Sequence, residues 1–328
     1  MSGENRRRVW LVLRVLVSVL LLGIVLVFAD VGEIARAVRD GNWAWFAAAV
    51  ALMGVSSIFG AVRWRMLLQD AHIDVSELRA VRIFAAGLFL NNLLPSSFGG
   101  DAVRAWLVGR ESGRLTRATT ATIVDKVTAL ACLFLVAWAA LAVDRAAVPN
   151  SVIAVLGWVT LGLVAVLAVT ALAAAGARPV VRRLPERPAA MTREAWTALR
   201  GWAGSRRLIA WLLGLGLLYQ SLGVLVVVLV GKTVGVEVSF PLAAAVTPAV
   251  LVAMLIPISI GGIGVREGGF VLLLGEAGIG AAEATLVSLL SAATIWLASA
   301  ALVALTAGYE SVRTRETAAR ALPRRPSG

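Results

Sequence analysis

The chain has 328 residues, of which 59% are hydrophobic and only 15% are charged. Soluble domains are about half apolar and about a quarter charged, so this composition excludes an ordinary soluble globular protein. The formal net charge of +12 comes almost entirely from arginines that lie between apolar runs. This pattern indicates contact with anionic lipid headgroups and argues against a nucleic-acid-binding protein.

Six apolar segments are long enough to cross a bilayer, for which a helix needs about 20 apolar residues. The first of them follows an arginine triplet and has no small-residue cleavage site, so we expect a retained helix and not a signal peptide. The sequence therefore predicts an all-α, polytopic integral membrane protein with six full transmembrane helices. These segments are 9–29, 43–62, 116–143, 152–174, 208–231 and 283–307.

Two further apolar stretches, 81–95 and 241–257, are short, and each ends at a proline followed by paired glycines. Proline and glycine interrupt helices, so each stretch predicts a helix that breaks inside the membrane. The two breaks share the pattern P-x-S-x-G-G-x-x-V-R, which begins at Pro95 and again at Pro257, nearly half the chain later. This repetition predicts two re-entrant helical hairpins in corresponding places of two repeats.

Each half of the chain then has the same order of elements: helix, helix, re-entrant hairpin and helix. Three helices separate the two hairpins, and an odd number of crossings reverses direction, so the hairpins would enter from opposite sides. Such inverted-topology repeats are typical of transporters with a substrate site near the midplane. The predicted units are repeat 1 at 1–150 with its hairpin at 81–112, repeat 2 at 151–310 with its hairpin at 241–280, and a basic cytoplasmic tail at 311–328, which we expect to be frayed.

The arginines also predict the orientation, because cytoplasmic loops of membrane proteins are enriched in Lys and Arg. With a cytoplasmic N-terminus and re-entrant hairpins, most basic residues fall on the cytoplasmic side, including those of the connection 175–207. We therefore expect a multi-pass protein of a bacterial cytoplasmic (inner) membrane with both termini in the cytoplasm. Arg63, Trp64 and Arg65 end the second helix, where they predict an interfacial anchor.

The tips of the two hairpins supply the first candidate substrate-binding residues. Paired glycines permit a tight reversal, after which a new half-helix begins with unpaired N–H groups and partial positive charge. Serine hydroxyls at such turns cap amides or bind a ligand. Two such N-termini converging from opposite faces would bind an anion such as phosphate, whereas close helix packing is the alternative role of the glycines. The residues concerned are Ser97, Gly99, Gly100, Ser259, Gly261 and Gly262.

Charged residues follow both tips in equivalent places. Asp101 precedes Arg104 by one helical turn, and Glu267 follows Arg266 directly. Intramembrane charges are costly and are therefore functional candidates. Each arginine would grip a phosphate diester, with the neighbouring acid releasing the arginine or carrying a proton. The alternative is a pair of interfacial ion pairs that fix the orientation of each hairpin.

Two further polar pairs lie inside apolar segments. Asn91 and Asn92 come one turn before the first break and need partners in lipid, either freed backbone groups or a substrate. Asp125 and Lys126 are neighbours within the segment 116–143 and point about 100° apart, so each is expected to have a different partner. Asp125 is expected in a functional or buried network, and Lys126 could snorkel toward the interface.

Taken together and in their order along the chain, the motifs described above resemble the lysylphosphatidylglycerol synthase transmembrane-region family. Its members are also described as flippase-like domain proteins. The resemblance covers nearly the whole chain. It implies a membrane region that in the best-known relatives flips an aminoacylated phospholipid and precedes a soluble aminoacyl transferase domain. Here the last predicted helix lies close to the end of the sequence, so we expect neither that domain nor synthase activity. The motifs are Asn91-Asn92-Leu93-Leu94-Pro95 with Gly99-Gly100 and Arg104, the pair Asp125-Lys126, and P-x-S-x-G-G-x-G-x-x-E from Pro257 to Glu267.

The leading hypothesis from the sequence is a membrane lipid transporter, or flippase, and not an enzyme. It would translocate a phosphate-bearing lipid between leaflets, either a phospholipid or a polyprenyl-phosphate-linked sugar, while the two repeats rock about the site. Two alternatives stay open. One is a membrane-embedded module of a glycosyl or aminoacyl lipid transferase, with Asp101, Asp125 and Glu267 as candidate acids or bases. The other is a non-transporting partner subunit of such an enzyme.

The expected partners are membrane lipids with anionic headgroups, and no nucleic acid. Coupling to an ion or a proton stays open, as does a lipid-modifying enzyme partner. We expect no cofactor and no metal site. Cys132 in an apolar run and His72 in a polar loop are the single cysteine and histidine, so neither an intrachain disulfide nor a Cys-based metal site is expected.

Overall fold

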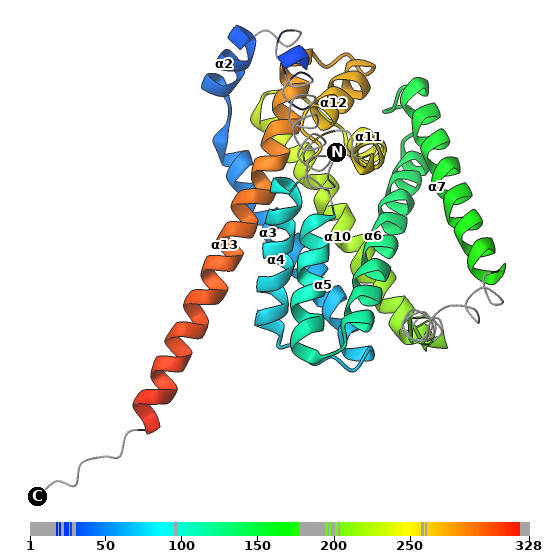
Figure 1. The fold of residues 1–328 in the computed structure, drawn as a ribbon. Coiled ribbons are helices and arrows are strands. Elements are labelled where there is room, and N and C mark those ends of the chain that lie inside the picture. The colour runs from blue at the N-terminus through cyan, green and yellow to red at the C-terminus, as the bar shows by residue number, and fades with distance from the viewer. Residues whose placement is uncertain are drawn as a thin grey trace, which may run out of the picture.

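The computed structural model describes residues 31–94, 98–176, 204–256 and 261–321, with a few single positions between them (18, 20, 23–25, 27, 194–195, 197, 201–202 and 259). Every regular element in this part of the chain is a helix (Figure 1). The helices are α2 (Val31–Asp40), α3 (Trp43–Asp70), α4 (Glu77–Leu93), α5 (Gly99–Ser112), α6 (Leu115–Val143), α7 (Asn150–Gly176), α10 (Arg206–Thr233), α11 (Phe240–Leu255), α12 (Val265–Gly275) and α13 (Ala281–Ala321).

Four of the predicted membrane spans are helices of sufficient length and hydropathy in the described residues. They are α3, α6, α10 and the first part of α13, from Ala281 to Tyr309. A fifth prediction, 152–174, corresponds to α7, while the predicted helix 9–29 is described at a few positions only. The breaks around Pro95, Ser97 and Pro257 and most of the connection 175–207 lie outside the described residues.

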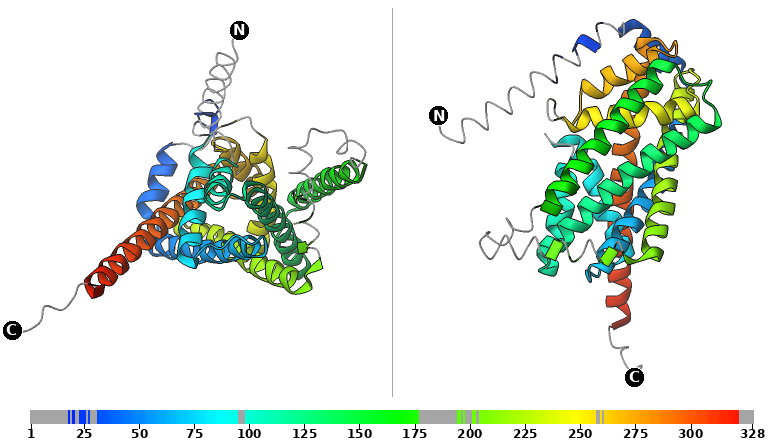
Figure 2. Two further views of the ribbon diagram at one scale, coloured as in Figure 1. Left: turned by 60° about the horizontal axis from the view of Figure 1, so that its bottom comes forward. Right: turned by 90° about the vertical axis from the view of Figure 1, so that its right-hand side faces the viewer.

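The tail prediction was wrong in one respect, because α13 continues as a helix to Ala321. Its last part projects from the bundle (Figures 1 and 2). The sequence after Tyr309 is rich in Ala, Glu and Arg, which are good helix formers, so a helix that is already nucleated in the bundle extends through it.

The helices α4 and α5 form a hairpin at one end of the bundle, and α11 and α12 form another at the opposite end (Figure 1). We call the end of the bundle with the α4–α5 hairpin the lower end. There Arg114 donates a hydrogen bond to the carbonyl of His72. At the upper end the Ser151 hydroxyl donates to Glu276 over 2.7 Å, and the Asn42 amide donates to the Thr233 carbonyl over 2.9 Å.

The two groups α3–α6 and α10–α13 pack on one another in corresponding pairs. The helix α3 lies against α10, α4 lies against α13, and α6 lies against α11. Within each group the arrangement also corresponds, since α5 packs on α4 and α6 just as α12 packs on α11 and α13. In contrast, α7 stands at the edge of the bundle with exposed apolar side chains such as Trp158 and Leu161 (Figure 2).

The hairpin α4–α5 is held by a close approach of its two helices. A Cβ atom added at Gly100 would run into the carbonyl oxygen of Gly87 on α4. Small residues allow membrane helices to approach closely, so that dispersion contacts and polar interactions bring them together without hydrophobic burial. Gly100, which the sequence left open between a packing and a ligand role, thus has a packing role here.

We expect Gly100→Ala to lower the free energy of unfolding by about 1–3 kcal/mol, because the new methyl group overpacks the crossing. Thermal unfolding in detergent micelles measures the loss. Gly223→Ala is the matched control, since a Cβ at Gly223 has no atom within 4 Å, and its stability should not fall. Equal losses in both variants would contradict the close-packing explanation.

Candidate functional site

Five charged side chains from three helices form one continuous set, which we call the charge network: Arg63, Asp101, Arg104, Asp125 and Lys126. Asp125 accepts from Arg63 at 2.7 Å through one carboxylate oxygen and from Arg104 at 2.9 Å through the other. Arg104 also lies 3.1 Å from Asp101, whose second oxygen is 2.9 Å from the Lys126 ammonium. Asp125 and Lys126 therefore have different partners, as their helical spacing predicted.

The centre of the charge network is almost completely buried. Arg63, Asp125 and Arg104 are only 1%, 2% and 3% exposed. The Arg104 guanidinium lies 5.0 Å from the ring centroid of Trp64 and 4.7 Å from that of Phe84, and such rings stabilise a desolvated cation. Ion pairs and aromatic faces thus replace much of the water that these charges lose, although Arg63 Nη1 and Arg104 Nε are buried without a hydrogen-bond partner among the described residues.

The prediction that Arg63 and Trp64 form an interfacial anchor was wrong. The helix α3 continues to Asp70, so Arg63 lies about two turns inside it. The Trp64 ring is buried, and its Nε1 donates to the Thr122 hydroxyl over 3.1 Å. Only Arg65 turns outward, where it pairs with Glu77. A buried Asp125 needs a cationic partner, and this need was the signal for Arg63 that the sequence contained.

The first half-helix uses its N-terminal amides within the protein. Asn91 on α4 accepts from the Gly100 amide at 2.8 Å and from the Asp101 amide at 3.2 Å. The second half-helix also uses an N-terminal amide within the protein, because the Glu267 carboxylate accepts from the Gly264 amide at 2.6 Å. The amides of Gly100, Asp101 and Gly264, at the half-helix N-termini that the sequence predicted as an anion site, are thus bonded to the protein's own side chains.

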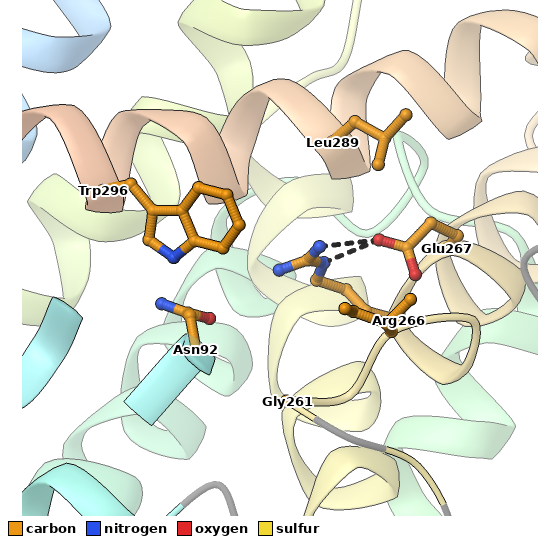
Figure 3. A pocket seen from close by; sticks show the side chains of 7 residues that line it. Asn92, Gly261, Arg266, Glu267, Leu289 and Trp296 are labelled. Carbon is orange, nitrogen blue, oxygen red and sulfur yellow. Dashed lines mark hydrogen bonds and ion pairs between the residues drawn. The ribbon is translucent and has the colours of Figure 1, made fainter. Parts of the chain in front are cut away.

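The tips of the two hairpins meet. A Cβ at Gly261 would lie 2.6 Å from the carbonyl oxygen of Asn92, and Gly261 has a φ of 59°, which disfavours any residue with a side chain. Beside this contact is a pocket, which we call the elbow pocket (Figure 3). It is lined by Asn92, Gly261, Ile263, Arg266, Glu267, Leu289 and Trp296.

Arg266 is held in the elbow pocket by one edge of its guanidinium. Its Nε and Nη2 donate to Glu267 at 3.0 and 2.7 Å, and Nε also donates to Ser288 at 3.2 Å. Its Nη1 has no hydrogen-bond partner among the described residues, and the guanidinium faces the space between Asn92 and Trp296 (Figure 3). Glu267 is fully buried. It therefore fixes the Nε and Nη2 edge of the Arg266 guanidinium, while the Nη1 edge stays open toward the pocket.

The remaining candidates are divided between these two places. Ser259 is buried at the second tip, while Ser97 lies outside the described residues. Gly99 packs against the side chain of Leu94, and Gly262 against that of Met254. The carboxylates Asp101, Asp125 and Glu267 are all engaged in ion pairs. Within the described residues no group of His, Cys, Asp and Glu could hold a metal ion.

The fold and the site define an all-helical, multi-pass membrane protein with ion pairs between its helices. The family model described as the lysylphosphatidylglycerol synthase TM region matches residues 11–302, and the chain belongs to this family. The family expected from the sequence motifs is thereby confirmed.

Similar proteins include UPF0104 membrane proteins of archaea. One from Pyrococcus horikoshii is 27% identical over 118 residues, which is 35% of this chain and 35% of the relative. Another, from Methanothermobacter thermautotrophicus, is 32% identical over 111 residues, which is 34% of this chain and 31% of the relative. The aligned part therefore spans about a third of these relatives' length. No solved structure matches the chain at a significant level.

The loss of stability on substitution in the charge network should depend on the balance of charge that remains. Asp125→Asn leaves three cations with one carboxylate, and breaking a buried pair in this way costs about 3–5 kcal/mol. Arg63→Met leaves two charges of each sign, so its loss should be clearly smaller. Thermal unfolding followed by circular dichroism compares the two variants. If Arg63→Met is as unstable as Asp125→Asn, the balance of charge is not what stabilises this region.

Proposed function

We propose that this protein moves a phosphate-bearing lipid between the two leaflets of a membrane and binds its headgroup in the elbow pocket. The observation that carries the proposal is the meeting of two hairpin tips, from opposite halves of the chain, beside an arginine with one open edge. A substrate that must visit both leaflets needs a site reachable from each, and the junction of two such hairpins is suited to this.

The topology in this proposal has six full spans and two re-entrant hairpins in inverted repeats. It is supported by the hairpins α4–α5 and α11–α12, which begin at opposite ends of the bundle, and by the corresponding packing of α3–α6 and α10–α13. Transport would follow from rocking of one repeat against the other, with the contact between Asn92 and Gly261 opening and closing.

The chemistry of the elbow pocket suits a phosphate group. A guanidinium presents paired N–H donors that match phosphate oxygens, and these charge-assisted hydrogen bonds are strong. Trp296 and Leu289 give the pocket apolar walls, against which the glycerol or sugar part of a headgroup would pack while the tails stay in lipid. The name of the family, which refers to a lipid synthase, is consistent with a phospholipid. A polyprenyl-phosphate-linked sugar would present the same phosphate.

The membrane in this proposal is a bacterial cytoplasmic membrane, with the lower end of the bundle and both termini in the cytoplasm. Arginines gather at the lower end, and positive charge favours the cytoplasmic side. The described arginines there include Arg65, Arg79, Arg110, Arg114, Arg117, Arg206 and Arg207.

Lipid scrambling in proteoliposomes tests the proposal. We expect the wild type to move fluorescent phosphatidylglycerol or a polyprenyl-phosphate lipid between leaflets, and the double variant Arg266→Gln/Glu267→Gln to slow this at least about tenfold, the loss of one strong ionic contact. The double substitution removes the cation without leaving Glu267 buried and unpaired.

Arg110→Gln is the matched control, because Arg110 is exposed over Trp106 at the lower end and should leave the rate unchanged. No scrambling of any of these lipids by the wild type, with and without an ion gradient, would disprove the proposed function. Equal slowing in the control variant would show that the elbow pocket has no specific role in the transport.

A further inference from the structure

The charge network is not electrically balanced. It contains three cations, Arg63, Arg104 and Lys126, but only two carboxylates, Asp101 and Asp125. No other carboxylate of the described residues pairs with these cations, so the set carries a net charge of +1. The corresponding set in the other half, Arg266 with Glu267, is balanced.

Lys126 is the only one of the three cations whose side chain is substantially exposed. The side chain of Lys126 is 35% exposed, whereas the side chains of Arg63 and Arg104 are 1% and 4% exposed. The Lys126 ammonium lies 5.6 Å from the ring centroid of Phe98, which is itself 43% exposed. An approaching molecule therefore meets a cation beside an aromatic ring, with Asp101 behind it.

The position is deep for a charge. Lys126 lies about 16 Å along α6 from Leu115, at a rise of about 1.5 Å per residue. A helix of 29 residues is about 43 Å long and overhangs a hydrocarbon core of about 30 Å by about 6 Å at each end. With α6 along the membrane normal and centred in the bilayer, Lys126 would lie about 10 Å inside the hydrocarbon level, where an unbalanced charge is expensive.

An external anion would balance this charge, and the Lys126 ammonium is the most exposed cation of the set. Phosphate carried by a lipid is the anion that reaches this depth, because its tails keep it in the membrane and its glycerol can pack on the Phe98 ring.

We propose that Lys126 and Phe98 form a binding site for a lipid headgroup with a net negative charge. The inference rests on the proposed function and deepens it, since it narrows the substrate to anionic lipids and adds a position before the elbow pocket. Two neighbouring residues of α4 link the two positions, because the Asn91 side chain accepts from the Asp101 amide while Asn92 lines the elbow pocket. A headgroup from the lower leaflet would leave the interface, bind at Lys126 and then pass to Arg266.

The test measures the thermal unfolding midpoint of the full chain in mixed micelles with phosphatidylglycerol, phosphatidylcholine or inorganic phosphate. A ligand that binds only the folded state raises this midpoint. We expect phosphatidylglycerol to raise it, and phosphatidylcholine and inorganic phosphate to raise it little. Native mass spectrometry should show phosphatidylglycerol retained by the wild type.

Two substitutions should act in opposite directions. Lys126→Met balances the charge network, so the variant should fold at least as stably as the wild type without lipid and lose most of the phosphatidylglycerol response, with binding at least tenfold weaker. Asp101→Asn raises the net charge to +2 and should enlarge the response. Lys126→Arg should keep it.

Lys232→Met is the matched control, because the Lys232 ammonium also lies over an aromatic ring, 4.8 Å from the centroid of Trp45, at the upper end. It should keep the wild-type response. The inference is overturned if Lys126→Met responds like the wild type, if Lys232→Met loses as much, or if phosphatidylcholine or inorganic phosphate acts as strongly. These readouts need no transport, so a Lys126-dependent response without scrambling would refute the proposed function and leave this binding site standing.

Discussion

The position of the first hairpin depends on one carboxylate. Asp125 on α6 accepts hydrogen bonds from Arg63 on α3 and from Arg104 on α5, and all three side chains are buried. In lipid no water can replace a lost partner, so separating these helices would leave charges unpaired at a cost of several kcal/mol. The hairpin is thereby fixed against α3 and α6, and the residues at its tip, Asn91 and Asn92, are held in place for the elbow pocket.

The sequence predicted those features that local chemistry determines. Proline and paired glycines indicated both breaks, and the helical angle between Asp125 and Lys126 indicated separate partners. Features that depend on packing were missed. Arg63 was placed at an interface because nothing local showed that α3 runs on to Asp70, and the half-helix amides were offered to a ligand because spacing cannot show that Asn91 reaches them. Side chains that come from other helices decide both cases.

The same repeated pattern has acquired different chemistry in the two halves. In the first, Arg104 is enclosed by two carboxylates and two aromatic rings, and its ion pair with Asp125 links α5 to α6. In the second, Arg266 keeps an open edge at the elbow pocket while Glu267 fixes the other. An equivalent position in the repeated sequence pattern therefore does not imply equivalent contacts, since Arg104 is enclosed while Arg266 keeps an open edge.

This difference also indicates where a rocking motion would occur. The contact between Gly261 and the Asn92 carbonyl is a van der Waals contact of backbone atoms, and separating it breaks no ion pair. Separating α5 from α6 would break the ion pairs of Asp125 and Asp101 with partners on the other helix. Opening the contact between Asn92 and Gly261 therefore breaks fewer ionic interactions than separating α5 from α6. If the protein alternates between leaflets as proposed, the helices α3, α5 and α6 that the charge network joins should move as one rigid unit, and the hairpin α11–α12 should move against them.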